Sequence, residues 1–375
     1  MGHLHYCICA SEQAINIVTV VNKSNLDENK NLDRVLNIFV RANDGGVKLE
    51  KADLLLSFME SHQDVFQPNG ARKEVRGFVE SLNKIELTNP NYNFSKDDVL
   101  KASLMISGLD IKYKISNFTS ANLLKISNNW ENIKLSLLLT VKLLAKYGFT
   151  EKTITSKNAL LPIAYYIYKN NLKESFIDLI SLESKKTREM LVFWLTKAMI
   201  SGTFGGSSDT VLEKARKLID ENKQFLKIDL VDEESIKDLI LRSSYKSVYS
   251  DLILKLVTPV NHWGEYEQDH IHPKSKFGNE LKNLKLADEE INVFIKKMNS
   301  IGNISLLNPR VNNDKRAESL SGWLNDQTPE TKDYLLIPPS VSHEFKDFIN
   351  FVKEREKIII EKLNFVLGVN RVAVN

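Results

Sequence analysis

Several side chains in the last third of the chain have the types and order needed to hydrolyse a phosphodiester. Asp269 and His270 are adjacent, and Asn303 and the pair Asn312-Asn313 follow further along. Such a reaction needs a water made nucleophilic and a cation for the charge that develops on the phosphate. A neutral imidazole, with a reference pKa of about 6.5, suits the first task. A carboxylate and an amide oxygen suit Mg²⁺, so the sequence indicates metal-dependent hydrolysis.

This chemistry limits how the backbone can run at the Asp-His pair. Neighbouring residues on a strand point to opposite faces, so a bulge or a strand end is needed to bring Asp269 and His270 toward one site. Pro273 fits a strand that ends just after the pair, because proline cannot continue the hydrogen-bonded ladder. A short β-like run at 303–307 also lies in this part of the chain.

Each part, taken singly, has an ordinary structural interpretation. A buried Asp-His pair is commonly a hydrogen-bonded core histidine, and Asn-Asn-Asp is commonly a turn. A zinc site from His262, His270 and His272 is a competing hypothesis, but the spacing is unlike that of paired zinc ligands and no cysteine assists. His272 is interpreted either as a substrate contact or as a surface histidine. His262 and His343 are taken as structural.

The combined pattern resembles that of a known nuclease family. The quoted segments are Asp269-His270-Ile271-His272-Pro273, Gly302-Asn303-Ile304-Ser305-Leu306-Leu307 and Asn312-Asn313-Asp314-Lys315. They are similar to the D-H-I-x-P, G-N-φ-x-L-L and N-x-x-K motifs of HNH endonucleases, which have the His-Me-finger or ββα-metal fold. The resemblance is closer to the nuclease domain of GmrSD-type modification-dependent restriction enzymes. The resemblance implies a first strand, a long loop, a second strand and then a helix that brings a metal-binding asparagine back to the first strand.

The resemblance also implies a role for each matched residue. His270 is expected to be the general base, and Asp269 and Asn312 are expected to hold Mg²⁺ or Mn²⁺, with Asn313 as a fallback for Asn312. Asn303 matches the asparagine that braces the ββα turn, so we expect it to support the catalytic residues from behind.

Basic residues surround these motifs, although the formal charge of the whole chain, 51 − 48 = +3, is small. Nucleic-acid binding must therefore come from a local surface. The candidates for contacts to a nucleic-acid backbone are Lys274, Lys276, Arg310, Lys315 and Arg316. Lys315 matches the lysine that closes the family motif. Each of these side chains taken alone fits a solvated surface better, and together they favour nucleic acid beside a metal site.

To position this site, we expect a mostly helical α+β protein with a ββα-metal domain at its carboxyl-terminal end. The 375 residues are enough for two or three domains. We expect a ParB-like fragment at 1–94, a helical middle domain at 95–256 and an HNH domain with a final helix at 257–375. In the middle domain, Ile133, Leu137, Val141 and Leu144 recur with the spacing of one helix face.

The first segment carries the ParB-like resemblance. Residues 38–56, with the Asn43-Asp44-Gly45-Gly46 turn, are similar to the end of the ParB-like domain that precedes the nuclease in GmrSD-type enzymes, and 14–21 is a strand candidate. The D-G-Q-Q-R-type motif expected upstream of the turn is absent. We therefore expect a truncated domain, or a ParB-like partner chain that supplies the missing half, and we doubt autonomous nucleotide hydrolysis.

The remaining sequence features favour a cytoplasmic protein. No apolar run reaches the roughly 18 residues that span a bilayer, and the first residues make a poor signal peptide. The two cysteines, Cys7 and Cys9, exclude a disulfide scaffold. The leading hypothesis is a Mg²⁺-dependent DNA endonuclease of bacterial restriction or phage defence. The alternatives are an assembly subunit that is inactive without its partner, and a nuclease directed at RNA.

Overall fold

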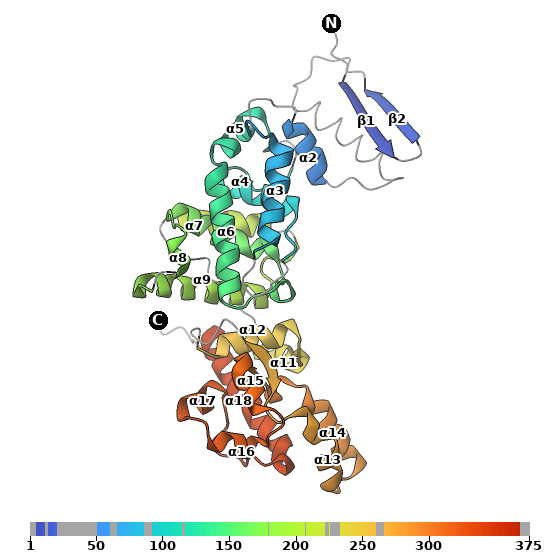
Figure 1. The fold of residues 1–375 in the computed structure, drawn as a ribbon, viewed down its shortest axis with the longest axis vertical. Coiled ribbons are helices and arrows are strands. Elements are labelled where there is room, and N and C mark those ends of the chain that lie inside the picture. The colour runs from blue at the N-terminus through green and yellow to red at the C-terminus, as the bar shows by residue number, and fades with distance from the viewer. Residues whose placement is uncertain are drawn as a thin grey trace. The chain divides into compact units, whose positions relative to one another are not determined.

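The structure is a computed structural model, and helices predominate in the residues that it describes (Figure 1). It describes residues 51–60, 66–85, 92–114, 117–178, 180–206, 208–221, 225, 233–259 and 266–367, and the backbone alone of 5–11 and 14–20. This confirms a mostly helical protein with little strand. The predicted turn at 43–46 and His262 lie outside the described residues. None of the described helices is long and apolar enough to span a membrane.

Two compact units make up the chain, and the first combines Met1–Ser81 with Phe94–Lys134. Its elements are β1 (His5–Ser11), β2 (Ala14–Val20), α2 (Lys51–Glu60), most of α3 (Ala71–Asn83), α4 (Lys96–Ile106), α5 (Ser120–Asn128) and the start of α6 (Trp130–Lys146). Strand β1 pairs antiparallel with β2, which confirms the strand predicted at 14–21. Trp130 packs on Phe66 and Phe78 edge to face, and its indole N–H donates to Glu74 at 2.9 Å.

The second unit combines Leu82–Asn93 with Leu135–Asn375. Its first part is helical and contains η3 (Glu151–Thr153), η4 (Lys157–Leu160), α7 (Leu161–Lys169), α8 (Ser175–Asp178), α9 (Leu182–Ser201), α10 (Asp209–Asp220), α11 (Glu233–Arg242) and α12 (Val248–Val257). The periodic residues of α6, Ile133, Leu137, Val141 and Leu144, are all buried, as their spacing predicts. The three-segment division expected from the sequence stays a prediction.

The rest of the second unit carries the predicted site residues. Its elements are β3 (Glu267–His270), η6 (Lys274–Phe277), α13 (Asn279–Asn283), α14 (Asp288–Met298), η7 (Ile301–Asn303), β4 (Ile304–Leu307), α15 (Pro309–Lys315), α16 (Leu320–Asn325), α17 (Pro329–Tyr334), η8 (Phe345–Asp347) and α18 (Phe348–Leu367). Helix α18 packs against α11, α12 and α14, as Figure 1 allows the reader to follow. The long final helix predicted from the sequence is therefore confirmed.

Helix α18 fixes the turn that leads into β4. The guanidinium of the fully buried Arg355 donates to the carbonyl oxygens of Leu335 and Ile301, each at 2.9 Å. Next to Ile301, a Cβ placed on Gly302 would lie 2.7 Å from a methyl carbon of Val352 on α18. The close approach of helix and turn therefore requires glycine at this position. A buried cluster of apolar side chains, among them Phe277, Phe294, Phe348 and Phe351, forms the core of this part of the unit.

Candidate active site

The predicted catalytic segment forms a short antiparallel strand pair. In β3 and β4, Glu267 lies opposite Leu307 and His270 lies opposite Ile304. The backbone N–H of Ile271 adds one more bond, to the carbonyl of Asn303 at 2.8 Å. Strand β3 ends at His270, and the β-like run predicted at 303–307 is β4 with its first residue in the preceding turn. The Asp-His pair is thus at a strand end, as the sequence allowed, but the two side chains still point to opposite sides of β3, Asp269 toward α15 and His270 toward Tyr245.

One side of β3 faces helix α15, which begins at Pro309 after the N-cap residue Asn308. Asn312 of this helix donates its amide N–H to the carboxylate of Glu267 at 2.8 Å. Lys315, one turn later, donates to the carboxylate of Asp269 and also to the carbonyl oxygen of His270. Helix α15 therefore holds the side of β3 that carries both carboxylates.

Lys315 is buried rather than part of the surface. Its side chain is 1% exposed, and its ammonium group also lies 5.4 Å from the centre of the Trp323 ring. Burial lowers the pKa of Lys315, and the charge and hydrogen bond of Asp269 oppose that shift. The side chain of Asp269, by contrast, is 22% exposed to solvent. In this position Lys315 holds Asp269 and the end of β3, and does not face solvent as a phosphate contact would.

His270 has different neighbours. Its ring packs on Tyr245 with the ring centres 4.3 Å apart, and its Nε2 is 2.9 Å from Oδ1 of Asn299. Tyr245 comes from the segment between α11 and α12. The backbone of this segment is hydrogen-bonded to the residues that precede β4, because the N–H of Tyr245 donates to the carbonyl of Asn299 at 2.8 Å. Gln268, on the same side of β3 by strand alternation, accepts from the backbone N–H of Lys246 at 2.6 Å.

The bond to Asn299 bears on the protonation of His270. A carbonyl oxygen only accepts, so with the Asn299 amide oriented as assigned, Nε2 carries the proton and Nδ1 is the basic nitrogen. The pKa of His270 is lowered, chiefly because its side chain is buried, while the bond to Asn299 and the charge of Asp269 act in the opposite direction. A neutral imidazole with one nitrogen held and the other basic has the properties of a general base.

Asn303 ties the two strands together. Its side chain is fully buried; Oδ1 accepts from the backbone N–H of His272 at 2.8 Å, and the amide N–H₂ donates to the carbonyls of Met298 at 2.8 Å and His272 at 3.3 Å. A single side chain thus links the residues after β3 to the end of α14. This is the bracing position expected of Asn303, and it has no direct contact with solvent.

His272 belongs to the core. It is 1% exposed and its ring meets Phe348 and Phe351 edge to face at 5.4 and 4.9 Å. Its Nε2 is buried without a hydrogen-bond partner. Burial, with Lys315 and His343 as nearby positive charges, lowers the pKa of His272 to about 3. Neither interpretation considered from the sequence, a substrate contact or a surface histidine, fits this position.

The other predicted nucleic-acid contacts differ in how freely they reach solvent. Lys274, Arg310 and Arg316 are exposed, as is Asn313. Lys276 is partly buried and forms an ion pair with Glu280 one helical turn later. His343 bonds to the carbonyl of Pro338 at 3.2 Å, which agrees with its structural interpretation.

Three residues of this arrangement were not singled out from the sequence: Glu267, Tyr245 and Asn299. Strand alternation could have identified Glu267, because it lies two residues before Asp269 and so shares its face. Tyr245 comes from an earlier helical segment, and Asn299 precedes the recognisable motif, so no local pattern marks either one.

The donor set fits a hard divalent cation better than zinc. Asp269 and Asn312 offer carboxylate and amide oxygens, which Mg²⁺ accepts while keeping several waters. Within the described ranges, no group of three or more His, Cys, Asp or Glu side chains gathers as a metal site. His270 and His272 lie in different surroundings, one beside Tyr245 and the other among phenylalanines.

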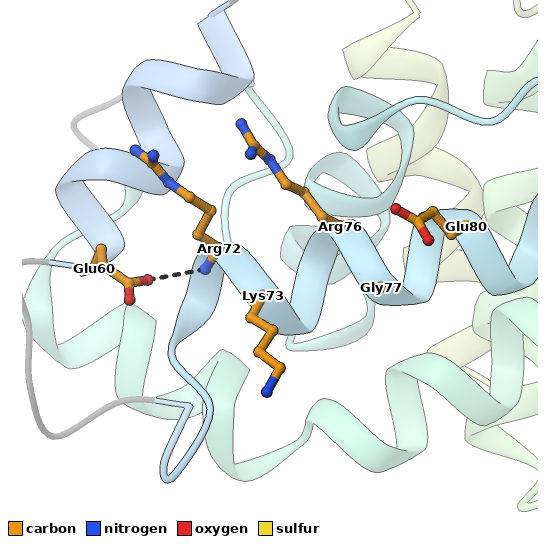
Figure 2. Close-up of a pocket in the computed structure, with 6 residues that line it drawn as sticks. All are labelled: Glu60, Arg72, Lys73, Arg76, Gly77 and Glu80. Atoms are coloured by element: carbon orange, nitrogen blue, oxygen red, sulfur yellow. Dashed lines mark hydrogen bonds between the residues drawn. The ribbon is translucent and has the colours of Figure 1, made fainter.

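An open pocket of about 430 Å³ lies along α2 and α3 in the first unit (Figure 2). It is lined by Glu60, Arg72, Lys73, Arg76, Gly77 and Glu80. Arg76 is paired with Asp53 at 2.9 Å, and the carboxylate of Glu60 accepts from the backbone N–H of Arg72 at 3.0 Å. Two carboxylates, Glu60 and Glu80, accompany the three basic side chains, so the pocket does not define an anion site, and it contains none of the predicted catalytic residues.

Comparison with known proteins adds no relative to this description. No protein-family model matches the chain, and no curated protein matches it either.

Proposed function

We propose that this protein is a Mg²⁺- or Mn²⁺-dependent HNH-type endonuclease that cleaves DNA in bacterial restriction or phage defence. The observation that carries the proposal is the arrangement at the end of β3. There, a neutral histidine oriented by Asn299 follows Asp269 in the strand, and on the other side of β3 the Asp269 carboxylate and the Asn312 amide are held between β3 and α15. This combination provides a base and hard-cation ligands within one short strand-helix unit.

The two sides of β3 suit the two halves of an in-line displacement. Attack on a phosphodiester requires the nucleophile and the leaving oxygen on opposite sides of the phosphorus. Asp269 contacts α15, whereas His270 contacts Tyr245 and Asn299. A phosphate that crosses the end of the strand would meet the base on one side and the metal ligands on the other.

The protein groups have separate tasks in this mechanism. His270 takes a proton from water at Nδ1, because Asn299 occupies Nε2. Asp269 and Asn312 would hold the metal, which when bound supplies positive charge for the scissile phosphate and its leaving oxygen. Lys315 keeps Asp269 and the His270 carbonyl in place. Asn303 keeps the end of β3 aligned with β4.

The exposed cations beside the site support a nucleic-acid substrate. Lys274 lies four residues beyond the last residue of β3, and Arg310 and Arg316 lie within α15 and at its end. Contacts of this kind bind the phosphate backbone without reading the sequence, and they make the affinity depend on salt.

The test is plasmid cleavage with Mg²⁺ or EDTA, on unmodified and base-modified DNA, by the wild type and by His270→Gln. The expected result is metal-dependent cleavage that falls roughly 10²- to 10⁴-fold in the variant, the range of a lost general base. His343→Gln, at a structural histidine, is the matched control and should cleave like the wild type.

Each result of this experiment has a definite meaning. Cleavage by His270→Gln at the wild-type rate would show that another group is the base. A wild-type protein that cuts no DNA in any lane contradicts an autonomous DNA nuclease, and RNA cleavage or co-purification with a ParB-like chain would then identify the alternative. Asp269→Ala should abolish Mg²⁺ binding in calorimetry, and an unchanged titration would reject this ligand.

A further inference from the structure

Glu267 forms an exposed contact at the edge of the candidate site. It is the first residue of β3, and its Oε2 accepts from Nδ2 of Asn312 at 2.8 Å. Asn312 lies 45 positions further along the chain, so the bond joins two elements rather than two neighbours. Sequence motifs assign no role to Glu267.

The contact is one of two bonds between side chains that connect β3 with α15 in the described residues, beside the bond from Lys315 to the His270 carbonyl. Glu267 and Asp269 are two residues apart and point to the same side of the strand. Asn312 and Lys315 are three residues apart and lie on the same face of the helix. Asn312 meets Glu267 while Lys315 meets Asp269, so the strand and the helix are joined by two successive side-chain bonds.

A carboxylate partner determines which end of the Asn312 amide faces it. An ionised carboxylate only accepts hydrogen bonds, whereas an asparagine side chain has a donor end and an acceptor end. The NH₂ end must therefore face Glu267, and the carbonyl oxygen points the other way. A metal ligand has to be that oxygen, because the amide nitrogen carries both of its hydrogens and does not bind Mg²⁺.

We infer that Glu267 is a positioning residue that turns the Asn312 amide so that its oxygen is presented for a divalent cation. This inference rests on the proposed function and assigns to the same site a residue that sets its affinity for metal. Glu267 acts through Asn312 and is not itself a ligand. The role requires an acceptor at position 267 and does not require a negative charge.

The experiment measures Mn²⁺ binding to the full-length protein by electron paramagnetic resonance, without substrate. Loss of one hydrogen bond worth about 0.5–1.5 kcal/mol predicts that Glu267→Ala weakens Mn²⁺ binding about 2- to 10-fold. Glu267→Gln keeps an acceptor oxygen, so its affinity should stay within about twofold of the wild type. Glu280→Ala, which removes one carboxylate from the ion pair with Lys276, is the matched control for net charge.

An exchange of donor and acceptor gives a second, more specific readout. Asn312→Asp places two carboxylates face to face and should weaken Mn²⁺ binding despite the added negative charge. With Glu267→Gln in the same chain, the introduced glutamine amide donates to the introduced aspartate carboxylate and leaves one oxygen of that carboxylate for the metal. The double variant should therefore bind Mn²⁺ more tightly than Asn312→Asp alone, a rescue that a merely structural contact would not give.

The outcomes separate this inference from the proposed function. Equal loss in Glu267→Gln and Glu267→Ala would show that Glu267 is a ligand, and no loss in Glu267→Ala would show that it is only a surface contact. Both overturn the inference, and both leave the nuclease proposal intact if Asp269→Ala abolishes binding. A wild type that binds no Mn²⁺ contradicts the inference and the metal site together.

Discussion

Two buried lysines, Lys255 in α12 and Lys315 in α15, are set in similar surroundings in different parts of the second unit. Lys255 donates to the carbonyl of Tyr147 at 2.6 Å, and its ammonium group lies over the rings of Phe149 and Tyr266 at 4.3 and 4.4 Å. Lys315 donates to the carbonyl of His270 and lies over a tryptophan ring. Each lysine also has an aspartate nearby, Asp251 for the first and Asp269 for the second.

The aspartates differ in their access to water. Asp251 is 5% exposed, and burial raises its pKa and lowers the pKa of Lys255 to about 8. The Asp269 side chain is 22% exposed. A buried lysine therefore does not by itself indicate a functional site in this protein. The feature that distinguishes the α15 pair is a carboxylate that is held by the protein and still partly exposed to solvent.

The largest effect is expected when Lys255 is removed. Lys255→Met leaves Asp251 buried without its nearby cation, which should lower the free energy of unfolding by about 3–5 kcal/mol. Urea denaturation of the full chain measures the change. The double variant Asp251→Leu with Lys255→Met should recover most of the loss, because no uncompensated charge remains. Equal losses in the single and double variants would show that lost packing, and not the charge, causes the effect.

Removal of Lys315 should cost less stability. Lys315→Met takes two hydrogen bonds from Asp269 and His270, but the Asp269 carboxylate can still be hydrated, so we expect a loss of about 1–3 kcal/mol. The same urea titration tests this value. A loss as large as that of Lys255→Met would mean that the access of Asp269 to water makes no difference, and would remove the distinction between the two pairs.

His272 extends the comparison to a buried base that has no carboxylate beside it. Its pKa is about 3 in the folded protein, against an ordinary value of 6.5. Between these values the unfolded chain binds a proton that the folded chain excludes, so stability falls as the pH falls below about 6.5. From pH 7 to pH 5 this residue should cost about 2 kcal/mol.

The check is the same unfolding measurement at pH 7 and pH 5 on the wild type and on His272→Leu. The variant should lose about 2 kcal/mol less than the wild type over this interval. An identical slope in His272→Leu and the wild type would show that His272 can be protonated in the folded state.

The smallest expected effect is on the salt dependence of DNA binding, and it should differ between an exposed lysine and a lysine held in an ion pair. Lys274 is exposed, whereas Lys276 is partly buried in an ion pair with Glu280. If DNA binds here, Lys274→Ala should reduce the slope of log affinity against log salt by about 1, and Lys276→Ala should reduce it less. Fluorescence anisotropy with labelled duplex DNA at several salt concentrations measures both. A larger change in Lys276→Ala would place the DNA elsewhere.

The sequence predicted the parts of this structure that local patterns encode. Periodic apolar residues mark the buried face of α6, and the order of the motifs anticipates β3, its end at His270, β4 and a helix carrying Asn312. Asn303 links the residue after Ile271 to the end of α14, while the role in the site expected of it stays a prediction. These features depend on residues close together in the chain, or on spacing along one element.

What the sequence did not predict depends on long-range packing. The identity of a single lysine or histidine does not reveal whether its side chain is buried. Lys315 was therefore expected at the surface, and His272 was not expected among phenylalanines. Tyr245 reaches His270 from the segment before α12, and no local periodicity encodes that contact.

The tie between Arg355 and Ile301 has a consequence for the order in which the site forms during synthesis. A nascent chain leaves the ribosome from its amino-terminal end, and β3, β4 and α15 emerge before α18. The turn before β4 stays without its guanidinium partner, and Gly302 without the helix that covers it, until α18 is outside the exit tunnel. We therefore expect the strand pair to be completed only once α18 has left the exit tunnel and can supply Arg355.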